Sequence, residues 1–443
     1  MIIVRKEDNK PFTVRRDIAG ERPVYWYENA NYLIVSSSIK EMLPYISNVR
    51  PNEPTEFRAL ECTCGVETLF GEIHNLLPAH ELTYCPGDDI AIREYWHIRK
   101  KDVLQSYQGL NHFDDLLRAA ITARIPTDKP WGMYLSGGID SGIIAAIAAL
   151  NIAKPPICFT CNFPEGERYD ELEYAQAIAD HIGSELIVIQ PTQADFERDL
   201  DDIIYNLEMP VASFSAFPLY SLARAASEYG VQVVLSGEGA DELFSGYTRH
   251  FILAHEELLY DFPLMQNYSS LLDFYLGSPL DRFSRLINRR AGKEHVVKEI
   301  LAPYFTQFDD VIHAMGYTEL KVLLPTILHM SHQMSSAFGI ENRSPFLDKS
   351  IIEYAFSIPS HSKIREGQTK WIIRELARRY LPELVTARKG KMGLVFPYGR
   401  WYPSNKPRGE FDRSRYQKEC YTSWNKVFFQ ERRWKNQYSG GHK

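Results

Sequence analysis

A glycine-rich loop between an apolar strand pattern and a helix pattern constrains this sequence more than any other feature. Met133-Tyr134-Leu135 is typical of a buried strand, residues 143–150 are typical of a helix, and Ser136-Gly137-Gly138-Ile139-Asp140-Ser141 lies between them. Paired glycines let backbone N–H groups approach phosphate oxygens, and the following helix N-terminus adds its positive end. The loop therefore predicts a phosphate site. An ordinary strand-to-helix turn with serine as N-cap is the alternative.

The alternation of strand, loop and helix continues after this loop and predicts a parallel sheet with right-handed crossovers. The segments before residue 100 instead alternate over short lengths, as in antiparallel strands, and residues 250–400 are mostly helical in pattern. We therefore predict an α/β fold, with a small, mainly β domain over 1–105 and the main domain over 106–443. Five segments carry the alternation: strands 157–160, 186–189 and 231–235, and helices 171–182 and 217–229.

Composition and charge exclude several functional classes. The net charge is −7, so no overall basic field favours nucleic acid. No apolar run approaches the ~20 residues that span a bilayer, and Met1-Ile2-Ile3-Val4 is followed at once by charged residues, so we expect no membrane segment and a cytoplasmic protein. The pair Cys158 and Cys161 lies in a strand pattern without a second pair, which disfavours a zinc or redox site. The basic stretch from Lys406 is expected to be a solvated tail.

A second glycine-bearing loop follows another predicted strand. It reads Ser236-Gly237-Glu238-Gly239-Ala240-Asp241-Glu242. In doubly wound sheets ligands bind at the carboxyl ends of strands, so the two loops can converge on one pyrophosphate. Asp140 and Asp241 would repel bare phosphate, and they therefore predict Mg²⁺ between carboxylate and phosphate. Neither loop has the Gly-Lys-Ser/Thr ending of a Walker loop.

These two loops and three later segments resemble the synthetase domain of the asparagine synthetase family, which includes β-lactam synthetases and lasso-peptide cyclases. The later segments are Tyr169-Asp170-Glu171, Glu341 to Asp348, and Arg388 to Pro397. The resemblance implies an ATP-pyrophosphatase fold of the adenine nucleotide α-hydrolase type, with ATP and Mg²⁺ as cofactors. It also implies a C–N ligase that adenylates a small-molecule or peptide carboxylate, releases pyrophosphate and forms an amide with ammonia or an amine.

The resemblance implies a role for each matching residue. Glu341 would orient or deprotonate the amine, with a plain ion pair to Arg343 as the alternative. Lys391 would neutralise charge at the α-phosphate, with a surface lysine as the alternative. Asp140 and Asp241 would hold the metal. The expected nucleotide-binding residues are Leu135, Ser136, Gly137, Gly138, Asp140, Ser141, Cys161, Ser236, Gly237, Glu238, Asp241 and Lys370.

The N-terminal region resembles only the second half of the family's glutaminase domain, through Arg16-Asp17 and Gly20 to Tyr25. The family's N-terminal catalytic cysteine is not matched, since the first cysteine is Cys62. We therefore expect residues 1–105 to be a truncated, catalytically inactive glutaminase-like domain. Its exposed sheet edge favours a homodimer or a separate glutaminase or partner chain, with a structural lid as the alternative.

His332-Gln333 stands where relatives usually carry Asp followed by a basic residue, which puts free aspartate as the substrate in doubt. His332 would contact substrate or simply pack in a helix. An intramolecular, lactam-forming cyclase is an alternative function, with Tyr304 or Tyr317 as partner of Glu341. Two others are a non-catalytic ATP-binding homologue and a nucleic-acid-thiolating ATP-pyrophosphatase, and the acidic net charge argues against the last.

Overall fold

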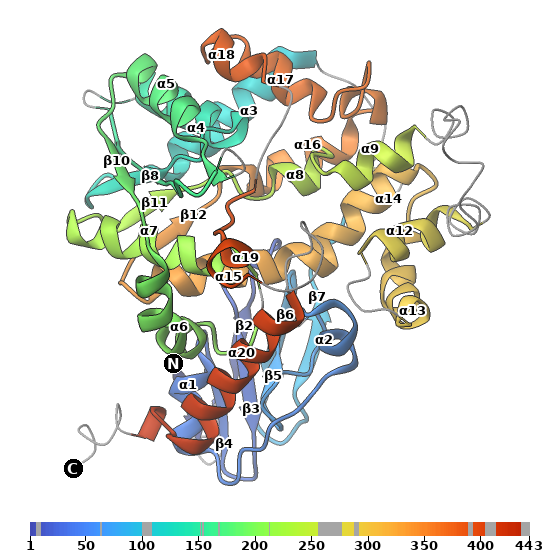
Figure 1. Cartoon of the computed structure of the whole chain (residues 1–443). Coiled ribbons are helices and arrows are strands. Elements are labelled where there is room, and N and C mark those ends of the chain that lie inside the picture. The colour runs from blue at the N-terminus through green and yellow to red at the C-terminus, as the bar shows by residue number, and fades with distance from the viewer. Residues whose placement is uncertain are drawn as a thin grey trace.

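A computed structural model places a five-stranded parallel sheet at the centre of the molecule, with strand order β10-β9-β8-β11-β12 (Figure 1). The α/β prediction is confirmed, but the fifth strand, at the start of the Glu341 motif, was not predicted. The strands are β8 (Trp131–Tyr134), β9 (Ile157–Cys161), β10 (Leu186–Ile189), β11 (Val233–Leu235) and β12 (Glu341–Arg343). The structure describes residues 1–5, 10–62, 64–99, 109–150, 152, 155–166, 169–211, 213–255, 277–287, 292–388, 393–403 and 413–435.

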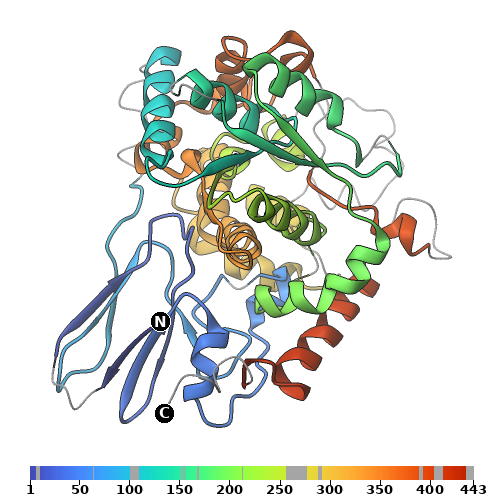
Figure 2. The same cartoon turned by 90° about the vertical axis from the view of Figure 1, so that its left-hand side faces the viewer.

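The central strands are apolar throughout because both faces of the sheet are covered. Successive side chains point to opposite faces, so Met133 packs into one core and Tyr134 into the other. Cys158 and Phe159 divide in the same way on the neighbouring strand. Helices α3, α4, α5 and α17 group on one side of the sheet, and α6, α7 and α15 on the other (Figure 2). These helices are α3 (Gly109–Arg124), α4 (Ile139–Leu150), α5 (Leu172–Ile182), α6 (Gln193–Leu207), α7 (Ala216–Glu228), α15 (Leu324–Ser336) and α17 (Trp371–Ala377).

Helix α6 was not predicted, although its start carries a clear local signal. Thr192 Oγ1 accepts a hydrogen bond from the Asp195 backbone N–H at 3.2 Å, and Asp195 Oδ2 accepts one from the Thr192 backbone N–H at 2.9 Å. This capping box satisfies two N–H groups that a helix start otherwise leaves without partners. The described residues between 250 and 400 are mostly helical, as predicted. The remaining elements of the main domain are α8 (Ala240–Leu243), α9 (Thr248–Ala254), α12 (Pro279–Ile287), α13 (Glu294–Phe305), α14 (Val311–Thr318), η6 (Glu319–Leu323), η7 (Pro345–Leu347), α16 (Lys349–Ser357), η8 (Ser360–Ser362), α18 (Glu383–Thr386) and α19 (Tyr398–Trp401).

The N-terminal unit consists of two antiparallel sheets, ordered β1-β4-β3-β5 and β2-β6-β7. It lies below the parallel sheet, in blue (Figure 1). The predicted boundary near residue 105 falls outside the described residues. Its elements are β1 (Ile2–Arg5), β2 (Phe12–Arg15), β3 (Tyr25–Glu28), β4 (Tyr32–Ser36), α1 (Ile39–Met42), η2 (Leu43–Tyr45), α2 (Thr55–Leu60), β5 (His74–Asn75), β6 (His80–Tyr84) and β7 (Ala91–Glu94).

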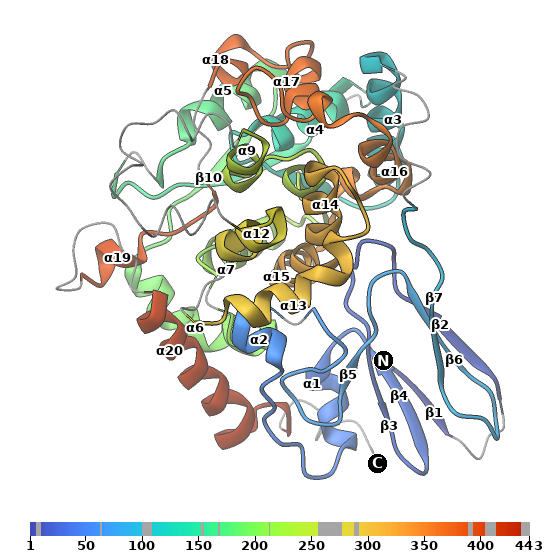
Figure 3. The ribbon, with the colours of Figure 1, turned by 90° about the vertical axis from the view of Figure 1, so that its right-hand side faces the viewer.

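The C-terminal basic stretch is not a solvated tail over its described residues. It forms α20 (Arg413–Asn425) and the short π-helix η9 (Lys426–Gln430), which lie beside α6 and the N-terminal unit (Figure 3). Trp424 is buried there, and its ring lies 5.4 Å from that of Phe70 in the N-terminal unit. The prediction was wrong because aromatic residues between the basic ones form a buried face. No described helix is long and apolar enough to cross a membrane.

One buried lysine lies apart from the sheet, between α14 and α16. Lys363 is fully buried, and its ammonium has no hydrogen-bond partner among the described residues. The ammonium lies 4.8 Å from the centre of the Phe356 ring. Burial lowers the pKa of Lys363 to about 7, against the opposing effect of Asp310.

We expect Lys363→Met to raise the free energy of unfolding near pH 6.5 by about 1–3 kcal/mol, the usual cost of a buried polar group without a partner. Because the folded-state pKa of Lys363 is lowered, the unfolded chain binds more protons between about pH 7 and pH 10.5, so this cost falls as pH rises. Urea unfolding at about pH 6.5 and pH 9.5 measures both effects. The exposed Lys418→Met is the control. If the free energy of unfolding of Lys363→Met changed with pH as steeply as that of the wild type, Lys363 would not be the group responsible for this pH dependence.

Candidate active site

The first glycine loop connects the end of β8 to the start of α4. Ser141 Oγ accepts from the Ser136 backbone N–H at 3.2 Å and lies 3.1 Å from Ser136 Oγ, which closes the loop on itself. Gly137 has φ +73°, and a Cβ there would lie 2.9 Å from the Glu171 carbonyl oxygen. Only glycine fits both the backbone angle and this approach of α5.

The second glycine loop lies directly against the first. A Cβ on Gly237 would come 2.9 Å from the Ser141 nitrogen and 3.0 Å from Asp140 Cβ. The two loops follow neighbouring strands, since β11 pairs with β8. The structure therefore brings both predicted loops together at the carboxyl edge of the sheet.

Lys370 joins the two predicted metal-binding carboxylates. Its Nζ lies 2.7 Å from Asp140 Oδ2 and 2.6 Å from Asp241 Oδ1. Lys370 is buried and has a left-handed backbone, with φ 54°, where it caps α17. Gly246 makes room for the contact, because a Cβ there would lie 1.9 Å from Asp241 Oδ1 and 2.1 Å from Lys370 Cε.

An apolar cavity lies on one side of the first loop. Leu135, Ser136 and Cys161, which were expected to bind nucleotide, line it, whereas Ser236 and Gly237, which were also expected to bind nucleotide, do not. Burial raises the pKa of the Cys161 thiol, so this side chain is a neutral wall. The space is only about 60 Å³, so a base can enter only if side chains move apart. The other lining residues are Tyr134, Phe159, Thr160, Phe163, Tyr169, Glu171, Leu222, Gly393, Leu394 and Val395.

A basic cavity of about 630 Å³ lies on the other side of the same loop, and Gly137 and Gly138 form part of its wall. Four basic side chains line it: Lys370, Arg374, Arg378 and Arg388. The one acidic side chain in its lining is Glu366. A positive cavity beside the start of a helix is suited to phosphates. Sequence reasoning missed Arg378 and Arg388 here, since nothing in their spacing indicated a shared cavity.

The two carboxylates fit Mg²⁺ if ATP supplies further ligands. In nucleotide sites Mg²⁺ is commonly bound by one or two carboxylates together with phosphate oxygens. Asp140 and Asp241 both reach one ammonium group, so one small cation can contact both. Among the described residues no three His, Cys, Asp or Glu side chains cluster as a metal site. Metal binding would also require Lys370 to leave its place between the carboxylates.

Glu341 begins β12 and is paired with two arginines. Arg343 Nε lies 3.1 Å from Glu341 Oε1, and Arg22 of the N-terminal unit bonds the same oxygen. Arg343 holds the pKa of Glu341 below its usual value, against the effect of burial and with help from Arg22. The ion pair with Arg343 is thus present, as the alternative interpretation expected. Tyr304 and Tyr317 do not contact Glu341 but pack beside each other, with Tyr317 against Phe308 and Phe356.

A rigid turn of the N-terminal unit carries Arg22 to Glu341. Both carboxylate oxygens of Asp17 accept backbone N–H bonds, including those of Gly20 at 2.6 Å and Arg22 at 3.1 Å. Glu21 in this turn accepts from the Ser344 backbone N–H at 3.2 Å. Burial and the nearby Asp17 raise the pKa of Glu21 to about 7. The N-terminal unit therefore forms one wall of the region around Glu341.

His332 and Glu238 face the same region. Burial lowers the pKa of His332 to about 4, and the charges that act on it belong chiefly to Arg22, Asp17 and Glu341. Glu238 was predicted to contact nucleotide, but it lines neither cavity. It instead accepts from Ser344 Oγ at 3.2 Å, and desolvation raises its pKa. Lys391 lies outside the described residues, so its predicted role stays a prediction.

The family described as asparagine synthase matches residues 112–431, well over half of the sequence. The chain belongs to this family. Asparagine synthetase (glutamine-hydrolyzing) 1 of Bacillus subtilis (strain 168) is 26% identical over 87% of this chain and 66% of its own length. A putative asparagine synthetase (glutamine-hydrolyzing) of Mycobacterium tuberculosis (strain ATCC 25618 / H37Rv) is 31% identical over 65% of this chain and 48% of its own. Amidase chry2 of Gibberella zeae is 22% identical over 87% of this chain and 68% of its own. The chain thus spans about half to two thirds of these asparagine synthase-family relatives.

We expect Gly237→Ala to weaken ATP binding about tenfold or more without unfolding the chain. Its φ is not in the left-handed region, so alanine changes only the space, and the added Cβ separates the loops at Ser141 and Asp140. Isothermal titration with ATP and Mg²⁺ measures the affinity. Gly71→Ala, whose Cβ would meet nothing nearer than 3.4 Å, is the control. Equal affinities for the two variants would show that the close approach of the loops is unimportant.

Proposed function

We propose that this chain uses ATP to adenylate a carboxylate and that ammonia or an amine then attacks the acyl-adenylate to form an amide. One observation carries the proposal. The two glycine loops meet at Asp140, Lys370 and Asp241, between an apolar cavity suited to a base and a basic cavity suited to phosphates. Membership of the asparagine synthase family supports the same reaction.

The described residues suit the first step, in which a carboxylate oxygen bonds to the α-phosphorus and pyrophosphate leaves. Backbone N–H groups at Gly137 and Gly138 and the basic wall at Arg374 and Arg388 would bind the leaving pyrophosphate and offset its growing charge. Bound Mg²⁺, held by Asp140 and Asp241, would add charge neutralisation at the phosphates. Lys370, once displaced from the two carboxylates, can turn to a phosphate oxygen.

Glu341 suits the second step, in which the amine nitrogen bonds to the acyl carbon, AMP leaves and the amine loses a proton. Its low pKa keeps it ionised at neutral pH, so it can orient an amine and accept its proton. In the parallel pairing of β12 with β11, Glu341 lies beside Val233. Val233 is two residues before the end of β11, so Glu341 lies about 7 Å along the strand direction from the second glycine loop. Arg22 and Arg343 hold the carboxylate there as positioning residues.

The acyl substrate lies, in this proposal, between the loops and the turn over residues 17–22. A neutral His332 lines that region in place of the family's usual aspartate. We therefore propose a carboxylate other than free aspartate. An intermolecular nitrogen donor is favoured over ring closure, because Tyr304 and Tyr317 pack away from Glu341.

A pyrophosphate-release assay across candidate carboxylates, with and without ammonium, tests the reaction. Asp140→Ala should lower the rate by about 10²–10³-fold, as expected for loss of a group that stabilises phosphate charge. The exposed Asp128→Ala should not change it. ATP binding without pyrophosphate release from any carboxylate would refute the ligase and favour a non-catalytic ATP-binding homologue.

Arg22→Ala tests the second step separately. Removing this arginine should raise the pKa of Glu341, so the acid limb of the amide-forming rate should move to higher pH. The shift should be about 0.2–0.7 pH units, because exposed ion pairs contribute only about 0.3–1 kcal/mol. The control is Arg58→Ala, which removes a similarly exposed pair with Glu53. The rate of pyrophosphate release should stay the same in both variants. If the pH profile of amide formation does not shift in Arg22→Ala, Glu341 is not the base.

A partner chain or second copy at the N-terminal unit is also part of the proposal. Among the described residues, strand β1 lies at the edge of its sheet and pairs with β4 alone, and Ile2 and Ile3 on it are exposed. A partner that adds a strand there could supply ammonia. Light scattering of the purified chain distinguishes a monomer from a dimer.

A further inference from the structure

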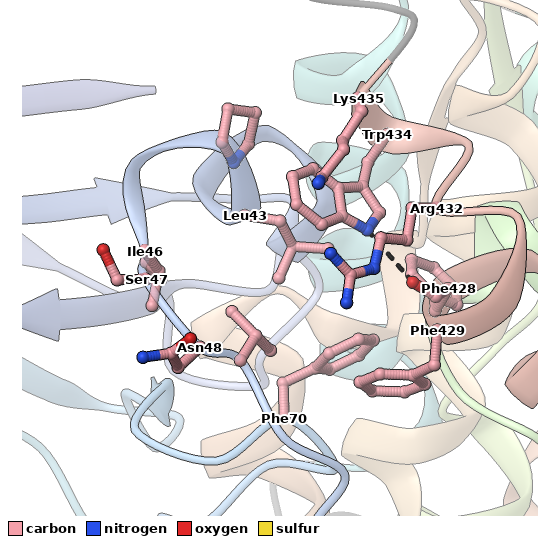
Figure 4. Close-up of a pocket in the computed structure, with 12 residues that line it drawn as sticks. Leu43, Ile46, Ser47, Asn48, Phe70, Phe428, Phe429, Arg432, Trp434 and Lys435 are labelled. Atoms are coloured by element: carbon pink, nitrogen blue, oxygen red, sulfur yellow. Dashed lines mark hydrogen bonds between the residues drawn. The ribbon is translucent and has the colours of Figure 1, made fainter.

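A cavity of about 540 Å³ lies at the junction of the two ends of the chain, apart from the loops (Figure 4). One wall comes from residues 43–49 and Phe70 of the N-terminal unit, and the other from residues 428–435 at the end of η9. None of its lining residues lines either cavity of the candidate active site. Its size falls within the ~300–1,000 Å³ of small-molecule sites.

The floor of this cavity is aromatic and held in place. Phe70 and Phe428 are buried, with ring centres 5.0 Å apart, and Phe429 stacks on Phe70 at 5.9 Å. Trp434 donates from its indole N–H to the Phe428 carbonyl at 3.1 Å, which fixes the indole at the edge of the cavity. Leu43 faces these rings from the N-terminal unit (Figure 4). An apolar or aromatic group would find a preformed surface here.

Two cations line this floor without a carboxylate partner. The Arg432 guanidinium points into the space between Leu43 and the phenylalanines, with Lys435 beside Trp434 (Figure 4). Neither Arg432 nor Lys435 forms an ion pair within the described part of the chain, and no acidic residue lines the cavity. The only charge contact of Lys435 there is with the Trp434 ring, at 5.5 Å.

Two neighbouring cations, Lys426 and Arg433, do form ion pairs. Lys426 lies 2.5 Å from Asp201, and Arg433 lies 2.8 Å from Asp202 and 2.8 Å from Glu431. These pairs hold the segment against α6. The basic residues of this stretch thus divide into one set that is neutralised against α6 and another set that faces the cavity with no counter-charge. A ligand that enters the cavity would have to bring the anion.

We propose that this cavity binds a small carboxylic acid with an aromatic or bulky apolar body. The carboxylate would accept paired hydrogen bonds from the planar Arg432 guanidinium, and the body would pack on Phe428, Phe429 and Trp434. A bound acid would join η2 to η9 and so fasten the N-terminal unit to the C-terminal helix. This inference does not depend on the proposed reaction.

Calorimetric titration of the full chain with 3-phenylpropionate tests the site. We expect saturable binding with a Kd of about 0.1–1 mM, as for other ligands of this size. The neutral 3-phenylpropanamide and the short acid acetate should each bind at least about tenfold more weakly, because the amide lacks the negative charge and acetate lacks the aromatic body. Bound 3-phenylpropionate should also raise the melting temperature.

Variants separate this cavity from other sites. Arg432→Ala should weaken 3-phenylpropionate binding about tenfold, while the control Lys418→Ala, which removes an exposed cation of α20 outside the cavity, should change it less than about twofold. In case the alanine variant folds poorly, Arg432→Glu offers a second test, since this variant should prefer 3-phenylpropylamine to 3-phenylpropionate. No saturable binding up to about 10 mM, or equal losses in Arg432→Ala and Lys418→Ala, would overturn the proposal.

Discussion

The contact of one ammonium group with two carboxylates holds the candidate site together. Lys370 lies between Asp140 at the start of α4 and Asp241 in α8, the short helix that follows β11. Two carboxylates this close, one buried and one half-buried, would repel each other without a positive charge between them. This contact constrains the backbone at two positions. Lys370 adopts a strained left-handed conformation, and Gly246 cannot be replaced by a residue with a side chain. If Mg²⁺ binds these carboxylates as proposed, it must replace the Lys370 ammonium between them.

Much of the nucleotide site could be predicted from sequence because its chemistry is local. Ser136 to Ser141 and Ser236 to Asp241 are short, and each follows an apolar strand pattern that fixes which edge of the sheet it occupies. What could not be predicted depends on contacts between distant segments. Strand β12 consists of only three polar residues with no apolar pattern. It is extended because its backbone forms hydrogen bonds with β11, a contact between segments that are distant in the sequence. The basic cavity gathers Arg374 of α17, Arg378 at the end of that helix and Arg388 from the loop after α18, which no local spacing encodes.

The N-terminal unit is part of the region around Glu341 and not merely a neighbour of it. Asp17 organises a turn in which Glu21 reaches Ser344, just after β12, and Arg22 reaches Glu341 on β12. In the sequence, Arg16-Asp17 indicated a resemblance to the family's glutaminase domain, but not that the turn contacts Glu341. The turn therefore has a structural role of its own, because Arg22 fixes the position of Glu341 and helps to keep its carboxylate ionised.

The junction of the chain ends has a consequence for how the protein is made. Phe57 and Phe70 share a core with Trp424 and Phe428, and Arg413 pairs with the buried Glu61. The N-terminal unit is synthesised before the segment over residues 413–430 that covers it. Its aromatic surface therefore stays uncovered during synthesis until α20 and η9 have been made. A chain truncated before Arg413 would leave this surface exposed, so such a truncation should yield an aggregation-prone product.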